Sequence, residues 1–378
     1  MNFLYKLMKK DPHDREGAIL VTSVMGIIMN LIIAAIKLII GAAVSSIAII
    51  SEGVNNATDA VTSVMAVAGT KLSAKRPDKK HPFGYGRIEY LTSLVISVLI
   101  IVSGFEMFTS SVRLIIDPEP ISISYTTLLI IALSGVIKYV QGTYTVKVGK
   151  RVDSGSLVAV GTECRSDSLV SLVTIISSVI FLVSGVSVDA YAGAVTSLFI
   201  LKAGIEVLLD TVSQILGEAG KKDLADMLYR EIRSTEGILN AADMMLHNYG
   251  PDSYSGSVNV ELDHKLTVGE AYAFLHELQL RIMHEHNVVM VFGIYAVNND
   301  ENDSRLLRER IAEFVRKTEH ILSFHAVYID RSAMRIYCDF TVDYQLPDPE
   351  AVDREFTQYM KALYPEYSLE LTIETDFV

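Results

Sequence analysis

Residues 44–70 read VSSIAIISEGVNNATDAVTSVMAVAGT, an apolar stretch with acids and amides in its middle. The stretch is long enough to cross a bilayer as a helix, which takes about 20 residues. Asn55 and Asp59 are four residues apart, so they share one helical face, and Glu52 lies a turn earlier on the same side. Because a charged side chain in hydrocarbon is costly, we expect this face to point into a bundle of helices rather than toward lipid.

Five further apolar runs occur before residue 211, whereas residues 211–378 have the periodic charges of an acidic soluble domain. The second and fifth runs are the weakest by hydropathy, because each carries acids or amides in its interior. The sequence thus predicts an α-helical membrane domain over 17–210, followed by a water-exposed part. The six predicted spans lie near 17–42, 44–70, 87–109, 122–146, 156–184 and 187–209.

Basic residues mark the cytoplasmic side of membrane proteins. Here they gather at the N-terminus and in the loops after the second and fourth predicted spans. We therefore expect a multi-pass protein of the cell membrane (inner or plasma membrane) with both termini in the cytoplasm. Residues 1–16 are polar and charged, and the apolar run after them is too long for a signal peptide, so they are interpreted as a retained cytoplasmic segment.

The fifth predicted span repeats the spacing of the second, because Glu163 and Asp167 are also four residues apart. Two helices that each offer a pair of oxygen ligands can enclose a dehydrated divalent cation when they pack face to face. Uncompensated carboxylates would repel one another and need a cation or protons between them. The sequence therefore predicts a metal site formed by Asn55, Asp59, Glu163 and Asp167.

Two structural explanations compete with a metal site. Amides in membrane helices often serve only as hydrogen-bond partners between helices, which applies to Asn55. Arg165 lies within the fifth-span pair and could neutralise one carboxylate.

The predicted ligands are all oxygens, which suit Mn²⁺, Mg²⁺ or Ca²⁺ better than Zn²⁺ or Cu. Mn²⁺ is therefore the favoured cargo, with Zn²⁺, Fe²⁺, Co²⁺ and Cd²⁺ as alternatives, and no organic cofactor is expected. The formal net charge of −12, with acids concentrated in the C-terminal part, argues against nucleic acid as a partner. The soluble half shows no nucleophile and base pair and no catalytic metal motif, so we do not expect an enzyme.

The loop before the third predicted span reads HPFGYGRIE over residues 81–89 and closely resembles a signature of the cation diffusion facilitator family. Over residues 15–298 the six spans, the two ligand pairs and the cytoplasmic part are similar to that family's plan. The resemblance implies a homodimeric exporter of divalent metal ions whose ligands are the four residues named above. An Asn in the second span with only carboxylates in the fifth is similar to the manganese-type members, although Glu163 stands where those usually have Asp.

Other family positions are matched only in part. The resemblance implies a second zinc site at Asp78, close to His81, but Tyr85 replaces the ligand His, so we expect this site to be missing or weak. Arg87 and Asp210 match a basic and an acidic residue that pair between protomers in the family. An ordinary interfacial Arg and a helix-end acid are the alternative.

The cytoplasmic half is interpreted as two ferredoxin-like units, over 211–298 and 299–378. Each has helix, strand, strand, helix, strand order, and the motif TEGIL at 235–239 recurs as TEHIL at 318–322. Typical family members have one unit, so the second is expected to pack on the first, to enlarge a dimer contact or to bind a regulator. The His ligands of the family's cytoplasmic domain are replaced by Asn259 and Tyr295, and the other nearby histidines are interpreted as surface residues: His247, His264, His284 and His286. The predicted helices lie near 219–235, 267–286, 303–318 and 348–363, and the strands near 241–248, 255–263, 288–296, 323–330, 334–343 and 367–375.

Carboxylate ligands bind a metal only when deprotonated, so an outward-facing site can be reloaded with protons. Proton antiport with alternating access is therefore the predicted mechanism. Two other classes stay open. A carrier for organic cations or a sodium-coupled carrier would show an aromatic lining or broken helices, and a non-transporting membrane metal sensor or scaffold would not need the predicted metal site.

Overall fold

The computed structural model describes residues 14–43, 47–118, 125–184, 186–217, 222–251, 253–298 and 302–375. Most of the predicted cytoplasmic segment 1–16 and the predicted boundary at residues 298 and 299 lie outside or at the edge of these ranges. The chain divides into a helical unit that ends at residue 218 and an α/β unit that comprises most of the rest.

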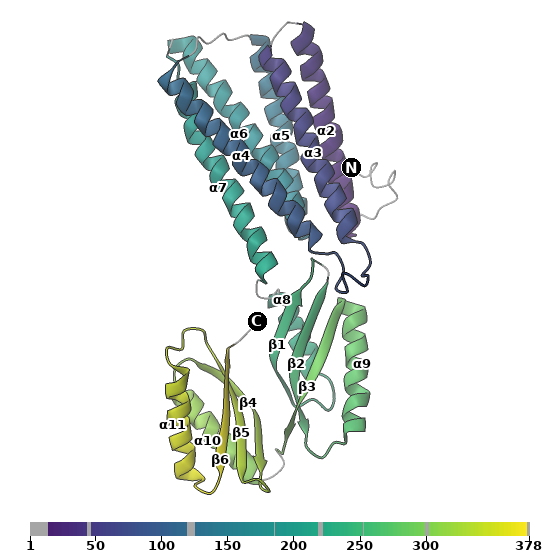
Figure 1. The fold of residues 1–378 in the computed structure, drawn as a ribbon, viewed down its shortest axis with the longest axis vertical. Coiled ribbons are helices and arrows are strands. Elements are labelled where there is room, and N and C mark those ends of the chain that lie inside the picture. Colours follow the sequence, from purple (N-terminus) through teal and green to yellow (C-terminus); the bar gives the residue numbers. More distant parts are fainter. Residues whose placement is uncertain are drawn as a thin grey trace. The chain divides into compact units, whose positions relative to one another are not determined.

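Among its described residues, the helical unit contains six long helices (Figure 1). They are α2 (Arg15–Ala43), α3 (Ile47–Ser73), α4 (Ile88–Ile116), α5 (Tyr125–Arg151), α6 (Gly155–Ser184) and α7 (Asp189–Leu216). The six predicted helical segments are thus confirmed. α4, α5 and α7 continue one to two turns past the predicted apolar runs, because a helix does not end where its sequence stops being apolar.

Five of the six helices are long and apolar enough to cross a membrane, and α3 is not among them. This agrees with the weak hydropathy predicted for the second run. The same prediction for the fifth run is wrong, because α6 contains a span-length stretch that is more apolar than those of α5 and α7. α3 packs along α2, and the other close pairs are α5 with α6 and α4 with α7. Figure 1 shows α2 beside α3 and α4 beside α7.

Glycines set the close crossing of α5 and α6. A Cβ atom on Gly142 would lie 2.8 Å from the backbone oxygen of Gly161, and one on Gly161 would lie 3.0 Å from the oxygen of Gly142. Small residues allow such backbone contact between membrane helices. The crossing fixes the α5 backbone near residue 138 against the polar part of α6.

A buried ion pair fastens one end of the helical unit. Glu89, the last residue of the HPFGYGRIE motif, is fully buried, and its two carboxylate oxygens accept hydrogen bonds from Arg15 Nη2 at 2.9 and 2.8 Å. Arg15 also donates to the carbonyl oxygens of Val152 and Asp153. The pair therefore joins α2, α4 and the turn after α5.

The α/β unit contains two modules with the predicted order of elements. The first α/β module comprises α8 (Lys222–Arg233), β1 (Asn240–Asn248), β2 (Tyr254–Asp263), α9 (Val268–His286) and β3 (Val288–Val297). The second comprises α10 (Asn302–Lys317), β4 (Ile321–Asp330), β5 (Arg335–Val342), α11 (Pro349–Leu363) and β6 (Ser368–Thr375). In each module the first two strands are antiparallel and the last two are parallel, in the sheet orders β1-β2-β3 and β4-β5-β6.

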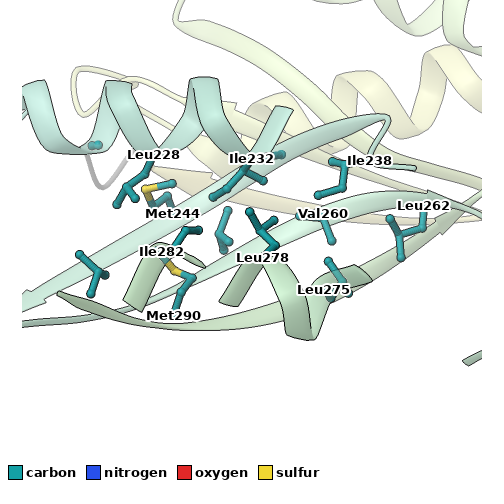
Figure 2. Packing of buried hydrophobic residues seen from close by; sticks show 14 of the residues in the cluster. Leu228, Ile232, Ile238, Met244, Val260, Leu262, Leu275, Leu278, Ile282 and Met290 are labelled. Carbon is teal, nitrogen blue, oxygen red and sulfur yellow. The ribbon is translucent and has the colours of Figure 1, made fainter. Parts of the chain in front are cut away.

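Each module has its own core between its helices and its sheet. Figure 2 shows the first core, where Leu228 and Ile232 of α8 and Leu278 of α9 lie against strand residues such as Met244 and Val260. Alternating buried positions on β2 give this face its apolar surface, because successive side chains of a strand point to opposite faces of the sheet. Thr267 caps α9 by a capping box with Glu270, which confirms the predicted helix start.

The internal repeat extends to local backbone detail. The first strand of each module has a register shift, after Ala242 in β1 and after His325 in β4. The next residue has positive φ in both cases, 53° at Asp243 and 54° at Ala326. Two modules with the same bulge at the same point support a duplicated unit.

Candidate metal site

The four predicted ligands line one cavity of about 350 Å³ in the helical unit. α3 supplies Asn55 and Asp59, and α6 supplies Glu163 and Asp167. The two helices are in contact. The i, i+4 spacing on each helix therefore does what the sequence predicts, because it presents both pairs of oxygens to one space.

Asp59 is enclosed on several sides. Its Oδ2 accepts a hydrogen bond from Asn56 Nδ2 at 3.2 Å and lies 2.6 Å from Lys138 Nζ. Asn56 is buried, whereas Asn55 is largely exposed although it lines the cavity. Asn56 was not among the predicted site residues, and it holds the Asp59 carboxylate through a contact one helical turn away.

Thr62 connects the two helices at Glu163. Its hydroxyl oxygen lies 2.7 Å from Glu163 Oε2 and 2.7 Å from the carbonyl oxygen of Asp59, and it can donate to one of them at a time. When it donates to Glu163, the side chain of α6 is held beside the backbone of α3.

Lys138 of α5 is the main residue that the sequence analysis missed. Its ammonium lies 2.6 Å from Asp59 Oδ2 and 2.5 Å from Asp167 Oδ2, and the side chain is only 4% exposed. The sequence does contain an indication of this residue, since a lysine stands in the middle of the fourth apolar run. The mean hydropathy of that run, however, is changed little by one charged residue.

A second intramembrane lysine, Lys37 of α2, lines the same cavity and pairs with Glu52 at 2.9 Å. Arg165, by contrast, lines a separate groove beside Glu206 and Asp210. The alternative explanation, in which Arg165 neutralises a predicted ligand, is therefore not supported, and Lys138 takes that place. On α6, Arg165 follows Glu163 by two positions, which turns it away from the face that Glu163 and Asp167 share.

Acids outnumber bases around the cavity. Of the described residues, five carboxylates and two lysines line it, so three of these formal negative charges are not matched by one of these lysines. No histidine or cysteine is among the described residues that line it. Oxygen donors with a surplus of negative charge suit a hard divalent cation.

A sequence model described as the cation efflux transmembrane domain matches residues 23–216, just over half of the chain. The chain belongs to the cation efflux family. This confirms the resemblance inferred from the ligand pairs and the HPFGYGRIE motif. It also makes the protein a member of a transporter family rather than of a catalytic one.

Three relatives illustrate the range of the cation efflux family. An uncharacterised transporter of Methanocaldococcus jannaschii is 28% identical over 68% of this chain and 90% of its own length. The manganese efflux system protein MneS of Bacillus subtilis is 27% identical over 70% of this chain and 91% of its own. A cadmium, cobalt and zinc/H(+)-K(+) antiporter of Bacillus velezensis is 24% identical over 65% and 78%. The first two relatives are matched over nearly their whole length, so this chain is longer than either of them.

The predicted secondary site lies in the loop between α3 and α4. The Tyr85 hydroxyl donates to Asp78 Oδ2 at 2.6 Å, and the backbone N–H groups of His81 and Lys80 donate to Oδ1 at 2.9 and 3.0 Å. These hydrogen bonds hold the pKa of Asp78 well below its usual range. The Tyr that replaces the expected His ligand thus engages the carboxylate itself, while His81 Nδ1 lies 3.5 Å from Asp78 Oδ1. The geometry favours a hydrogen-bonded turn over a metal site here.

Arg87 and Asp210 lie at helix ends, Arg87 just before α4 and Asp210 in the last two turns of α7. Asp210 lines the groove that also contains Arg165 and Lys150. The pairing suggested by the family resemblance would join two protomers, and it stays a prediction.

In the α/β unit, the positions at which the family resemblance implies histidine ligands have a different chemistry. Asn259 Nδ2 donates to Asp243 Oδ2 at 3.0 Å, and the Tyr295 hydroxyl donates to the same oxygen at 3.1 Å. His325 of the second module lies 2.9 Å from that oxygen through Nε2 and is 1% exposed. The sequence analysis missed Asp243 and His325, because their pairing crosses between modules.

Among the described residues, one group of three acids and histidines has ligand atoms within 4.8 Å of one another: Glu231, Glu285 and His286. His286, for which the sequence predicts only a surface position, lies 2.9 Å from Glu231 Oε2. Arg281 also pairs with Glu231 at 3.0 Å. The guanidinium already compensates this acid, so the group is explained by ion pairs.

Proposed function

We propose that this protein exports divalent metal ions from the cytoplasm, with Mn²⁺ as the principal cargo. The observation that carries the proposal is the single cavity in which oxygens of α3 and α6 converge. Asn55, Asp59, Glu163 and Asp167 would hold the dehydrated ion, and outward release would follow from movement of the helices against one another.

The ligand chemistry supports Mn²⁺ over Zn²⁺. The described lining of the cavity offers carboxylates, amides and hydroxyls, which are hard ligands that suit Mn²⁺. A relative named as a manganese efflux protein supports the same ion, whereas a relative named for cadmium, cobalt and zinc keeps the other divalent ions as alternatives.

Proton antiport is the proposed coupling. A carboxylate binds a metal ion only in its deprotonated form, so protons that return to Asp59, Glu163 or Asp167 after release would compete with rebinding. The proposed protein is a homodimer in the cell membrane with both termini in the cytoplasm, as the family resemblance and the basic loops suggest.

Metal accumulation in cells tests the export and its ion. Cells expressing wild type, Asp59→Ala or Glu206→Gln would be challenged in turn with Mn²⁺, Zn²⁺, Fe²⁺ and Co²⁺. We expect wild type and Glu206→Gln to lower cellular Mn, because Glu206 lies outside the cavity, and Asp59→Ala to restore it. If the wild type lowers cellular Zn instead of cellular Mn, the exported ion would be Zn²⁺ rather than Mn²⁺. An Asp59→Ala variant that still exports would refute the site.

Purified protein in liposomes tests the coupling. With Mn²⁺ inside the liposomes and an imposed pH gradient, antiport predicts that acidification of the opposite side speeds Mn²⁺ flux and that Mn²⁺ flux moves protons. Flux that neither responds to nor produces a pH gradient would exclude proton antiport while leaving metal transport intact.

A membrane metal sensor or scaffold is the second candidate. It is favoured by one observation, namely that Lys138 already compensates two of the predicted ligands. This candidate predicts no change of any cellular metal when the wild-type protein is expressed.

A further inference from the structure

Lys138 bridges two helices at the point where a metal ion would bind. Its ammonium lies 2.6 Å from Asp59 of α3 and 2.5 Å from Asp167 of α6, so it forms a charge-assisted hydrogen bond with each carboxylate. An ion that binds both carboxylates would sit within a few ångströms of Nζ, where two positive charges repel strongly in a poorly hydrated site. The ion and the ammonium therefore compete for the same two oxygens.

The α5 backbone cannot easily withdraw to relieve this competition. Gly135 and Gly142 flank Lys138 on α5, and a Cβ on either would lie 2.8 Å from an atom of α6, Ser171 Cβ or the Gly161 oxygen respectively. The helix is thus held against α6 one turn to each side of the lysine. Only the flexible four-carbon side chain is free to pivot.

The cavity offers the ammonium another acidic position. Glu106 of α4 lines the same cavity as Lys138, Asp59 and Asp167. A lysine that leaves the two aspartates can therefore remain in an acidic space without entering lipid, which keeps the cost of displacement low.

We propose that Lys138 is a tethered counter-cation that competes with the transported ion for Asp59 and Asp167. Its displacement weakens ion binding, and its return to the two carboxylates promotes ion release. The inference rests on the proposed transport function and assigns a further residue to it. Lys138 acts by setting the charge at the ligands and does not itself bind the metal.

Lys37 provides the matched comparison. It is a buried lysine that lines the same cavity, but its ammonium pairs with Glu52, which is not one of the four proposed ligands. Loss of the Lys37 charge should therefore not free a ligand pair, whereas loss of the Lys138 charge should free two carboxylates at once.

The test measures Mn²⁺ binding by calorimetry and Mn²⁺ flux in liposomes for full-length protein. Lys138→Met and Lys138→Gln should bind Mn²⁺ about tenfold or more tightly, because the ion no longer breaks two ion pairs. The maximal flux of both variants should fall, since release loses its competitor. Lys138→Arg keeps the positive charge, so its Mn²⁺ affinity and flux should stay closer to those of the wild type. Lys37→Met should not bind Mn²⁺ more tightly than the wild type does.

A purely structural role for Lys138 predicts the opposite pattern, in which binding and flux weaken together. That result, or unchanged affinity in both neutral variants, would overturn the proposal. If the neutral variants unfold without metal, the proposal predicts that Mn²⁺ stabilises them more than it stabilises wild type, and unfolding that Mn²⁺ does not prevent would also overturn it. If the wild-type protein does not bind Mn²⁺, or binds it no better than Asp59→Ala does, the proposed transport function itself would be refuted.

Discussion

At the scale of single residues, the pair between Asp243 and His325 has a defined pH dependence. Burial opposes protonation of His325, but the hydrogen bond to Asp243 and the charges of Asp243 and Asp339 outweigh it and raise its pKa above the ordinary value. Burial likewise opposes ionisation of Asp243, but hydrogen bonds from His325 and Asn259 outweigh it and lower its pKa. Both shifts mean that the charged pair is favoured in the folded protein.

The pair should therefore stabilise the α/β unit most between about pH 4 and pH 6.5, the ordinary values of the two groups. Its contribution is lost as pH rises through the raised pKa of His325, and as pH falls through the lowered pKa of Asp243. Burial also raises the pKa of Asp339 and Glu374. Their ionisation therefore destabilises the folded unit as pH increases, which adds to the loss caused by deprotonation of His325.

We predict that His325→Gln costs about 1–3 kcal/mol near pH 6 and less at pH 9. Cys338 reports on this change, because it is fully buried in β5 of the same module. The measurement is the temperature at which Cys338 becomes reactive to a maleimide, read by peptide mass spectrometry in wild type and variant at the same pH. An equal difference at both pH values would contradict the pair's role.

At the scale of elements, the crossing of α5 and α6 positions the cavity. A Cβ on Gly142 would lie 2.8 Å from the Gly161 oxygen and 2.9 Å from the Arg165 backbone nitrogen, and neither backbone atom can move alone. We predict that Gly142→Ala separates the helices, costs about 1–3 kcal/mol and reduces Mn²⁺ binding. Val140→Ala is the control, because Val140 is 61% exposed.

The measurement is the maleimide reactivity of Cys164, which is buried on α6, together with Mn²⁺ binding by the same preparations. Earlier labelling of Cys164 in Gly142→Ala than in Val140→Ala would support a tight crossing. Identical labelling and binding in both variants would mean that α5 and α6 accommodate the methyl group.

The elements themselves were predictable because hydrophobic period and length are local signals. The predicted span 44–70 and the predicted strand 255–263 show this, since they agree closely with α3 (Ile47–Ser73) and β2 (Tyr254–Asp263). Lys138 was missed for the converse reason: its partners lie on α3 and α6, 79 and 29 residues away in sequence. The acids on those helices indicated a cation, but not that a lysine from a third helix would supply one.

At the scale of the whole molecule, this chain contains a second α/β module, and the M. jannaschii and MneS relatives match 68–70% of the chain over nearly their whole length. The second module protects polar groups of the first module. Glu261 is 2% exposed, its Oε1 accepts a hydrogen bond from the Ala326 N–H at 2.8 Å, and Arg308 lies 3.5 Å from its Oε2. The first module is therefore adapted to its partner, since an unpaired buried carboxylate would be costly.

Truncation after Asn298 tests separately whether the second module is needed for metal export and whether it stabilises the first module. We predict that the shortened chain still exports Mn²⁺, because the proposed site lies wholly in α3 to α6 and the M. jannaschii and MneS relatives match 68–70% of this chain over nearly their whole length. Its first module should lose about 1–3 kcal/mol of stability, because Glu261 and Asp243 lose their partners in the second module. The control for flux is the truncated protein with Asp59→Ala. Flux in liposomes and hydrogen exchange of β1 and β2 measure the two effects. Abolished flux in a truncated protein whose helices remain folded would instead make the second module part of the transport cycle.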